Sequence, residues 1–111
     1  MSGKASWRAT IGLARRAGLL VIGQDRVLSV TKKGKKRYVI VLSSDHSDAL
    51  RRSLGVQKGC QHRVVRLGRV DRRELGSIIG LSRCQVVALP EGEGLTGLVI
   101  DQLVEGGEAV E

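Results

Sequence analysis

Aromatic residues are almost missing from this 111-residue chain, which has one Trp, one Tyr and no Phe. Domains that read single-stranded RNA with an RNA-recognition motif or a cold-shock fold stack bases on several aromatic rings. Trp7 and Tyr38 do not form a pair of rings on neighbouring strands. The sequence therefore argues against both of these folds.

Long hydrophobic runs and paired cysteines are also missing. The longest apolar run, from Tyr38 to Leu42, is far shorter than the roughly 20 residues that a membrane helix needs. The two cysteines, Cys60 and Cys84, are not in CxxC spacing, and Met1 is not followed by an apolar signal core. We therefore expect a cytoplasmic protein without membrane association.

Motifs for cofactors, metals and catalysis are weak. A GxGxxG pattern lies between Gly92 and Gly97, but the acidic Glu91 and Glu93 would repel a pyrophosphate there. The candidate metal ligands and nucleophiles lack the spacing of known sites: Cys60, His62, Cys84 and His46. We expect no cofactor, no metal, no catalytic residue and no enzymatic activity.

Charge is unevenly distributed along the chain. The 19 Lys and Arg against 11 Asp and Glu give a net charge of +8. The balance is +9 over residues 1–37, +5 over 38–83 and −6 over 84–111. Because phosphate neutralisation dominates non-specific binding to nucleic acids, the first two thirds of the chain favour a polyanionic partner.

Glycines divide the chain into short segments that alternate between helical and strand patterns. Helices are predicted over 6–17, 23–34, 71–80 and 95–104, with another from a cap at Ser44 or Asp45 to Leu54; strands are predicted over 19–22, 38–42, 63–67 and 85–89. The run 38–42 is β-branched and does not alternate, which is typical of a central strand covered on both faces. This order predicts one domain, a three-layer α/β/α sandwich with a four-stranded mixed sheet and about five helices. Its core is expected over 5–104, followed by an acidic tail at 105–111.

One helix start offers a site for a phosphate backbone. The predicted second helix begins at Gly23, where free backbone N–H groups and polar side chains precede Lys32 and Lys33. The loop from Gly80 to Arg83 joins this site if both segments lie at one edge of the sandwich. Strands separate every pair of helices, so no helix-turn-helix is predicted, and RNA is favoured over DNA.

Four segments of the sequence resemble one family of proteins. They are residues 11–18, 23–34, 38–45 and 74–80, the last with the element Leu-Gly-x-x-Ile-Gly. Over about residues 5–104 the chain resembles the kink-turn-binding ribosomal protein superfamily of the large-subunit type, and within it the small bacterial YlxQ-type branch. The resemblance implies an α/β/α sandwich that binds RNA without doing chemistry.

The resemblance also implies two RNA-binding segments. Kink-turn binders grip RNA with Gly-Thr-Asn-Glu-x-x-Lys, which corresponds here to Gly23, Gln24, Asp25, Arg26 and Ser29. A loop that packs over the kink corresponds to Leu81, Ser82, Arg83 and Cys84. Only Gly23 matches the family pattern, and the anion at Asp25 stands against the usual sheared G·A readout, whereas Arg26 and Lys32 could hold RNA in a different way.

The sequence thus predicts a monomeric, non-enzymatic RNA-binding protein, associated with the ribosome or with structured, kink-turn-like RNA. The predicted RNA-binding residues are Gly23, Gln24, Asp25, Arg26, Ser29, Lys32, Lys33, Lys35, Lys36, Arg37, Leu81, Ser82 and Arg83. The lysines and Arg37 would contact phosphates, and Arg26 and Arg83 would contact sugars or base edges. The alternative is a protein-interaction module whose basic surface binds an acidic protein.

Overall fold

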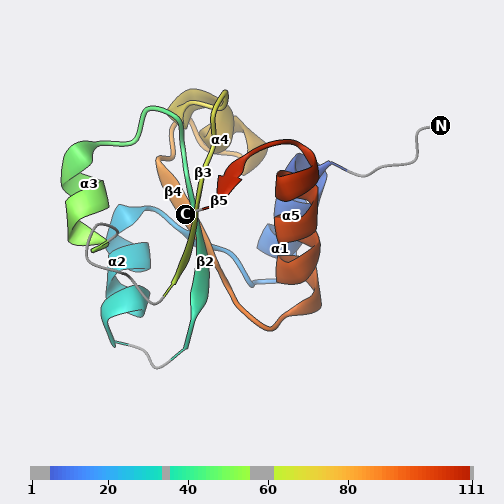
Figure 1. Ribbon diagram of the computed structural model, residues 1–111, viewed down its shortest axis with the longest axis horizontal. Coiled ribbons are helices and arrows are strands. Elements are labelled where there is room, and N and C mark those ends of the chain that lie inside the picture. Colours follow the sequence, from blue (N-terminus) through green and yellow to red (C-terminus); the bar gives the residue numbers. More distant parts are fainter. Residues whose placement is uncertain (1–5, 34–35, 56–61, 111) are drawn as a thin grey trace.

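A computed structural model describes residues 6–33, 36–55 and 62–110 of the chain (Figure 1). It contains helices α1 (Trp7–Arg16), α2 (Gln24–Lys33), α3 (Asp48–Ser53), α4 (Arg72–Ile78) and α5 (Gly94–Glu105). Its strands are β1 (Val21–Ile22), β2 (Tyr38–Leu42), β3 (Arg63–Arg66), β4 (Val86–Pro90) and β5 (Ala109–Val110). The predicted alternation of helices and strands is confirmed.

The strands form one mixed sheet in the order β1-β4-β2-β3-β5. Strands β2 and β3 are parallel, whereas the other neighbouring pairs are antiparallel. The predicted four-stranded mixed sheet is therefore present, and β5 extends it by two residues beside β3. As a result, part of the segment that the sequence marks as an acidic tail is paired with the sheet.

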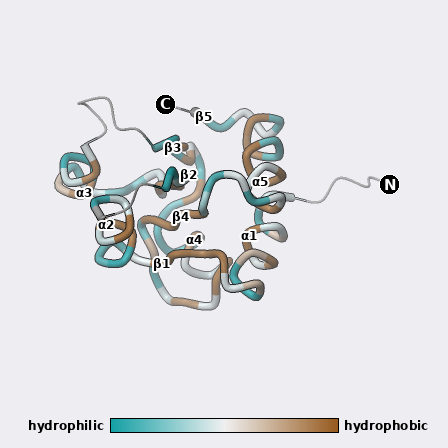
Figure 2. Tube along the Cα trace, turned by 90° about the horizontal axis from the view of Figure 1, so that it is seen from below, coloured by the Kyte–Doolittle hydropathy of each residue, from teal (hydrophilic) through white to brown (hydrophobic). Residues whose placement is uncertain are grey.

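Helices cover both faces of the sheet, which confirms the sandwich. Figure 1 shows α2 and α3 on one side of the strands and α1 and α5 on the other, and Figure 2 shows the same layers from below. Two clusters of buried side chains fill the spaces between these layers. Val39 and Val41 belong to the cluster beneath α1 and α5, whereas Ile40 and Leu42 belong to the cluster beneath α2 and α3.

Strand β2 lies in the middle of the sheet, as its sequence predicts. Residues Val39–Leu42 are fully buried because successive side chains point to opposite faces and both faces are covered. Within the described ranges, none of the helices is both long and apolar enough to cross a membrane.

The start of the third helix differs from the prediction. We expected Ser44 or Asp45 to cap it, but the cap is Ser47, whose hydroxyl oxygen accepts the Leu50 N–H at 3.1 Å. Ser44 donates its N–H to the carbonyl oxygen of Val70 at 2.8 Å, and the Asp45 carboxylate is bonded to Arg72. These long-range contacts extend the loop after β2, so the helix cap lies two or three residues later than predicted.

Candidate nucleic-acid interface

The site begins at Gly23, between β1 and α2. Gly23 has a φ of 91°, a left-handed conformation that side chains disfavour, and donates its N–H to the carbonyl oxygen of Val86 at 3.1 Å. This bond fixes the N-terminal end of α2 against the start of β4. Gln24, Asp25 and Arg26 follow in the first turn and are exposed, so the donors of the helix start face an open surface.

The second segment is the loop between α4 and β4. Leu81 donates its N–H to the carbonyl oxygen of Gly76 at 2.8 Å, and Cys84 donates its N–H to that of Arg72 at 2.9 Å. These bonds hold the loop against the side of α4. Leu81 remains 43% exposed, and Ser82 and Arg83 are also exposed.

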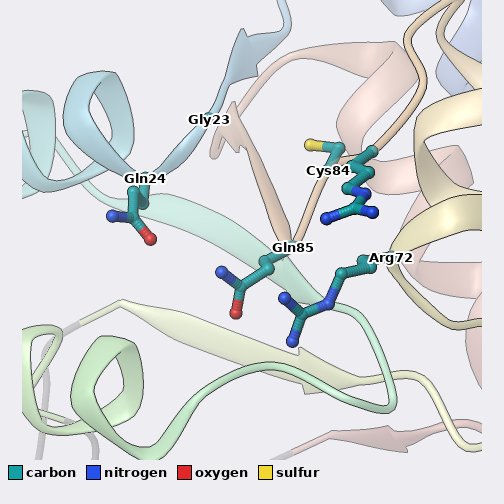
Figure 3. Close-up of a pocket in the computed structure, with 6 residues that line it drawn as sticks. Gly23, Gln24, Arg72, Cys84 and Gln85 are labelled. Carbon is teal, nitrogen blue, oxygen red and sulfur yellow. The ribbon is translucent and has the colours of Figure 1, made fainter.

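The two segments meet at a hollow of about 250 Å³ (Figure 3). The residues that line it come from the start of α2, the start of α4 and the loop before β4: Gly23, Gln24, Arg72, Arg83, Cys84 and Gln85. The structure therefore brings the start of α2 and the loop with Arg83 to one edge of the sandwich. This is the arrangement on which the sequence-based site depends.

Two residues that line the hollow, Arg72 and Gln85, were not predicted from the sequence. Arg72 follows the helix cap Asp71, and Gln85 directly precedes the apolar strand β4. Polar side chains at the ends of elements that converge on one edge are the signal that could have identified them. This signal can be used only when the strand order is known, because the order places β4 between β1 and β2.

Arg72 is bound to Asp45 on the loop after β2. The Arg72 Nε donates to Asp45 Oδ2 at 3.2 Å, and its backbone N–H donates to Asp45 Oδ1 at 2.8 Å. Burial acts to raise the pKa of Asp45, but the Ser43 side chain, followed by the backbone N–H and the positive charge of Arg72, outweighs burial and lowers the pKa below its ordinary value. Asp45 is therefore ionised at neutral pH and remains paired with Arg72.

The lowered pKa of Asp45 predicts an acid-dependent loss of stability. A carboxyl group whose pKa is lower in the folded protein stabilises the fold above its unfolded pKa, and this contribution is lost as the pH falls through the folded pKa. We expect the difference in Tm between the wild type and Asp45→Asn to be constant above about pH 5 and to shrink below about pH 4. Thermal unfolding at pH 6, 5, 4 and 3 measures this difference. An equal difference at all four values would contradict the assignment.

Cys84 lies at the hollow, but its thiol is buried. The side chain is 6% exposed, and its Sγ–H donates to the carbonyl oxygen of Val86 at 3.1 Å. Burial raises the pKa of the thiol above its ordinary value of 9.0. At neutral pH the group is therefore a protonated thiol and a poor nucleophile.

This environment predicts slow alkylation of Cys84. We expect iodoacetamide to modify it at least about tenfold more slowly in the native protein than in urea, because only an accessible thiolate reacts rapidly. Mass spectrometry of the peptide that contains Cys84 gives both rates. Equal rates in the two states would show that the thiol is open to solvent.

Three other predicted basic residues lie at the end of the sheet opposite the hollow. Strand β4 pairs with β2 so that Leu42 is opposite Val86, next to Gly23, whereas Tyr38 is opposite Pro90. Lys32, Lys36 and Arg37 are exposed and lie near this second end. The backbone carbonyl oxygen of Arg37 accepts the Glu91 N–H at 2.8 Å. The structure therefore does not gather all predicted residues in one place.

The other predicted residues are placed as follows. Ser29 is exposed in the middle of α2, between the two ends of the helix. Lys33 is the last residue of α2, and Lys35 lies outside the described residues, as does Cys60. In the described part of the chain, no three His, Cys, Asp or Glu side chains are close enough together to hold a metal ion.

Solved structures with the same fold include a protein of unknown function from Bacillus halodurans. Its TM-score with this chain is 0.74 at 25% sequence identity, over 91% of this chain and 99% of that protein. A 15.5 kDa RNA-binding protein from Giardia lamblia gives a TM-score of 0.63 at 16% identity, over 88% of this chain and 82% of that one. No curated protein sequence is significantly similar to the chain.

A family model gives the clearest relationship. The model of the ribosomal protein L7Ae/L30e/S12e/Gadd45 family matches residues 5–94. The matched range includes both segments that form the hollow and ends at the start of α5. Because it covers most of the sequence, the chain belongs to the ribosomal protein L7Ae/L30e/S12e/Gadd45 family.

Proposed function

We propose that this protein binds structured RNA at the edge of the sandwich where α2 begins. The observation that carries the proposal is the meeting of Gly23, Arg72 and Arg83 at one open hollow. Membership of a ribosomal protein family and the fold shared with an RNA-binding protein of Giardia lamblia support it. The same family membership confirms that the chain is not an enzyme.

The residues at the hollow suit RNA acceptors. Arg72 and Arg83 present guanidinium groups, which donate hydrogen bonds to phosphate oxygens and to base carbonyls. Gly23 has no side chain and lets an RNA backbone approach the start of α2 closely. Arg26 adds an exposed cation in the first turn of α2, whereas Asp25 repels phosphates and instead accepts hydrogen bonds from RNA amino or hydroxyl groups.

The second basic group extends the surface along α2. This ten-residue helix is about 15 Å long, so Lys32 lies roughly two turns from Arg26. An RNA helix that contacts the hollow would reach Lys32, Lys36 and Arg37 with its next phosphates. We assign these residues to phosphate contacts that add affinity without sequence preference.

The finer parts of the proposal concern the RNA and the cellular setting. We propose a monomeric, cytoplasmic protein of the YlxQ-type branch that binds a kink-turn-like or ribosomal RNA. Gln24, Asp25, Arg26 and Ser29 replace the usual kink-turn-reading residues, so any preference for a kink must come from a different set of contacts. The exposed Leu81 and Arg83 are the groups expected to pack over it.

Fluorescence anisotropy with three RNAs tests this function. The probes are a kink-turn RNA, a straight duplex of matched length and a single strand, each titrated across a salt series. We expect the kink-turn RNA to bind more tightly than both controls, with a preference that persists at high salt. A steep salt dependence shared by all three would indicate backbone binding only. No binding at low salt would contradict the proposal and favour the alternative, an acidic protein partner.

A further inference from the structure

The loop after β2 holds both residues that the sequence did not predict at the hollow. Besides its bonds to the Asp45 carboxylate, Arg72 donates from Nη2 to the Asp45 carbonyl oxygen at 2.6 Å. Gln85 accepts the backbone N–H of Ser47 through Oε1 at 2.7 Å. Both side chains are therefore tied to one short segment, residues 45–47.

These bonds determine which atoms face the hollow. Asp45 accepts one hydrogen bond from Nε and one from Nη2 of Arg72, which leaves both N–H groups of Nη1 and one of Nη2 as donors for a ligand. The amide oxygen of Gln85 accepts the Ser47 N–H, so the amide nitrogen is left to donate to a ligand. Figure 3 shows the ends of Arg72 and Gln85 close together at the same opening. Arg72 and Gln85 therefore offer donors there, which suits an RNA group rich in oxygen acceptors.

The supporting segment is itself fixed by backbone hydrogen bonds. Ser43 donates its N–H to the carbonyl oxygen of Gln85 at 2.9 Å, and Ser44 donates to that of Val70 at 2.8 Å. Cys84 donates to that of Arg72 at 2.9 Å. The loop after β2, the start of α4 and the start of β4 thus form one hydrogen-bonded unit, which holds the donors in place before any ligand arrives.

We propose that Asp45 is a positioning residue for RNA binding, acting through Arg72 without touching the RNA. The proposal rests on the proposed function. Simple electrostatics predicts the opposite effect of Asp45 on RNA affinity, because an anion beside an RNA site weakens the attraction of phosphates. If charge alone mattered, removal of Asp45 would tighten binding. If positioning matters, loss of the Asp45 carboxylate leaves the Arg72 guanidinium held only through the Asp45 backbone carbonyl oxygen and weakens binding to a structured RNA.

The matched control is the ion pair between Arg8 and Glu74, away from the hollow. Arg8 Nη1 lies 3.4 Å from Glu74 Oε2, and both side chains are about half exposed. Asp45→Asn and Glu74→Gln each remove one negative charge from an arginine pair and change the net charge equally. Any difference between the two variants in RNA affinity therefore does not come from net charge.

The experiment measures the affinity of both variants for the kink-turn RNA by anisotropy. We expect Asp45→Asn to bind about 5- to 20-fold more weakly than Glu74→Gln, while Arg72→Met and the double variant Asp45→Asn/Arg72→Met bind equally weakly. NMR reports the state of the Arg72 side chain separately from the stability of the fold. The Arg72 Nε–Hε signal should be resolved in the wild type and averaged with the other arginines in Asp45→Asn.

The outcomes separate the two proposals. If the wild type binds RNA and Asp45→Asn binds as tightly as Glu74→Gln or more tightly, Asp45 does not position Arg72 for binding. An unchanged Arg72 Nε–Hε signal in Asp45→Asn also overturns the positioning role. If the wild type binds none of the three RNAs, the proposed function itself is wrong and the role of Asp45 falls with it.

Discussion

Gly76→Ala is expected to destabilise the protein by about 3 kcal/mol and to abolish tight RNA binding. A Cβ at this position would lie 2.7 Å from the backbone N of Arg83 and 2.8 Å from its Cα. Backbone atoms cannot turn away as a side chain can, so the α4–β4 loop must move from α4. This movement displaces Arg83 from the hollow. Chemical denaturation measures the stability, and anisotropy with the kink-turn RNA measures the binding.

Gly97→Ala provides the control for this substitution. Gly97 is exposed on α5, and beyond its chain neighbours and the backbone of its own helix no atom lies within 4 Å of a Cβ added there. Because alanine favours a helix over glycine by about 1 kcal/mol, this variant should be slightly more stable and should bind RNA normally. If Gly76→Ala is as stable as Gly97→Ala, the close approach of Arg83 to α4 is wrong.

The double charge reversal Arg26→Glu/Arg83→Glu is expected to weaken RNA binding by about 100-fold or more. Each arginine in contact with RNA contributes about 1–3 kcal/mol, and the two side chains lie on the two segments that meet at the hollow. Both side chains are exposed, so the fold should retain its Tm. The dissociation constant from anisotropy, measured at one salt concentration, gives the loss.

The control reverses two exposed arginines elsewhere, with Arg16→Glu on α1 and Arg52→Glu on α3. The change in net charge is identical, and neither residue lines the hollow. We expect a loss of about tenfold or less from the weaker overall attraction. Equal losses in the two double variants would mean that RNA binds through net charge and that the assigned site is wrong.

The layers of the fold could be predicted because local signals agree with the tertiary structure. Tyr38–Leu42 lacks alternation because helices cover both sides of β2. Asp71 caps α4 as its sequence context predicts, with its carboxylate accepting the N–H groups of Arg73 and Glu74. The family resemblance is also confirmed, whereas the YlxQ-type branch stays a prediction.

The details of the site could be predicted only in part. The start of α2 is marked by Gly23, but its distance from Arg37 depends on the register of β2 and β4. Nothing near Arg72 in the sequence indicates that its guanidinium meets Asp45, which is 27 positions earlier. The predicted cap of α3 was wrong for the same reason, since Ser44 and Asp45 form hydrogen bonds with residues 70 and 72. Long-range pairing of polar groups leaves no periodic pattern in a sequence.

The most direct test of the RNA-binding surface is an NMR titration of the isotope-labelled protein with the kink-turn RNA. We predict that the largest backbone amide shifts occur at residues 23–26 and 81–85, with smaller shifts at Lys32, Lys36 and Arg37. The outer surface of α5, which carries Asp101 and Glu105 and no basic residue, should remain unchanged. Shifts concentrated on α5 or α1, with residues 23–26 and 81–85 unaffected, would contradict the proposed interface.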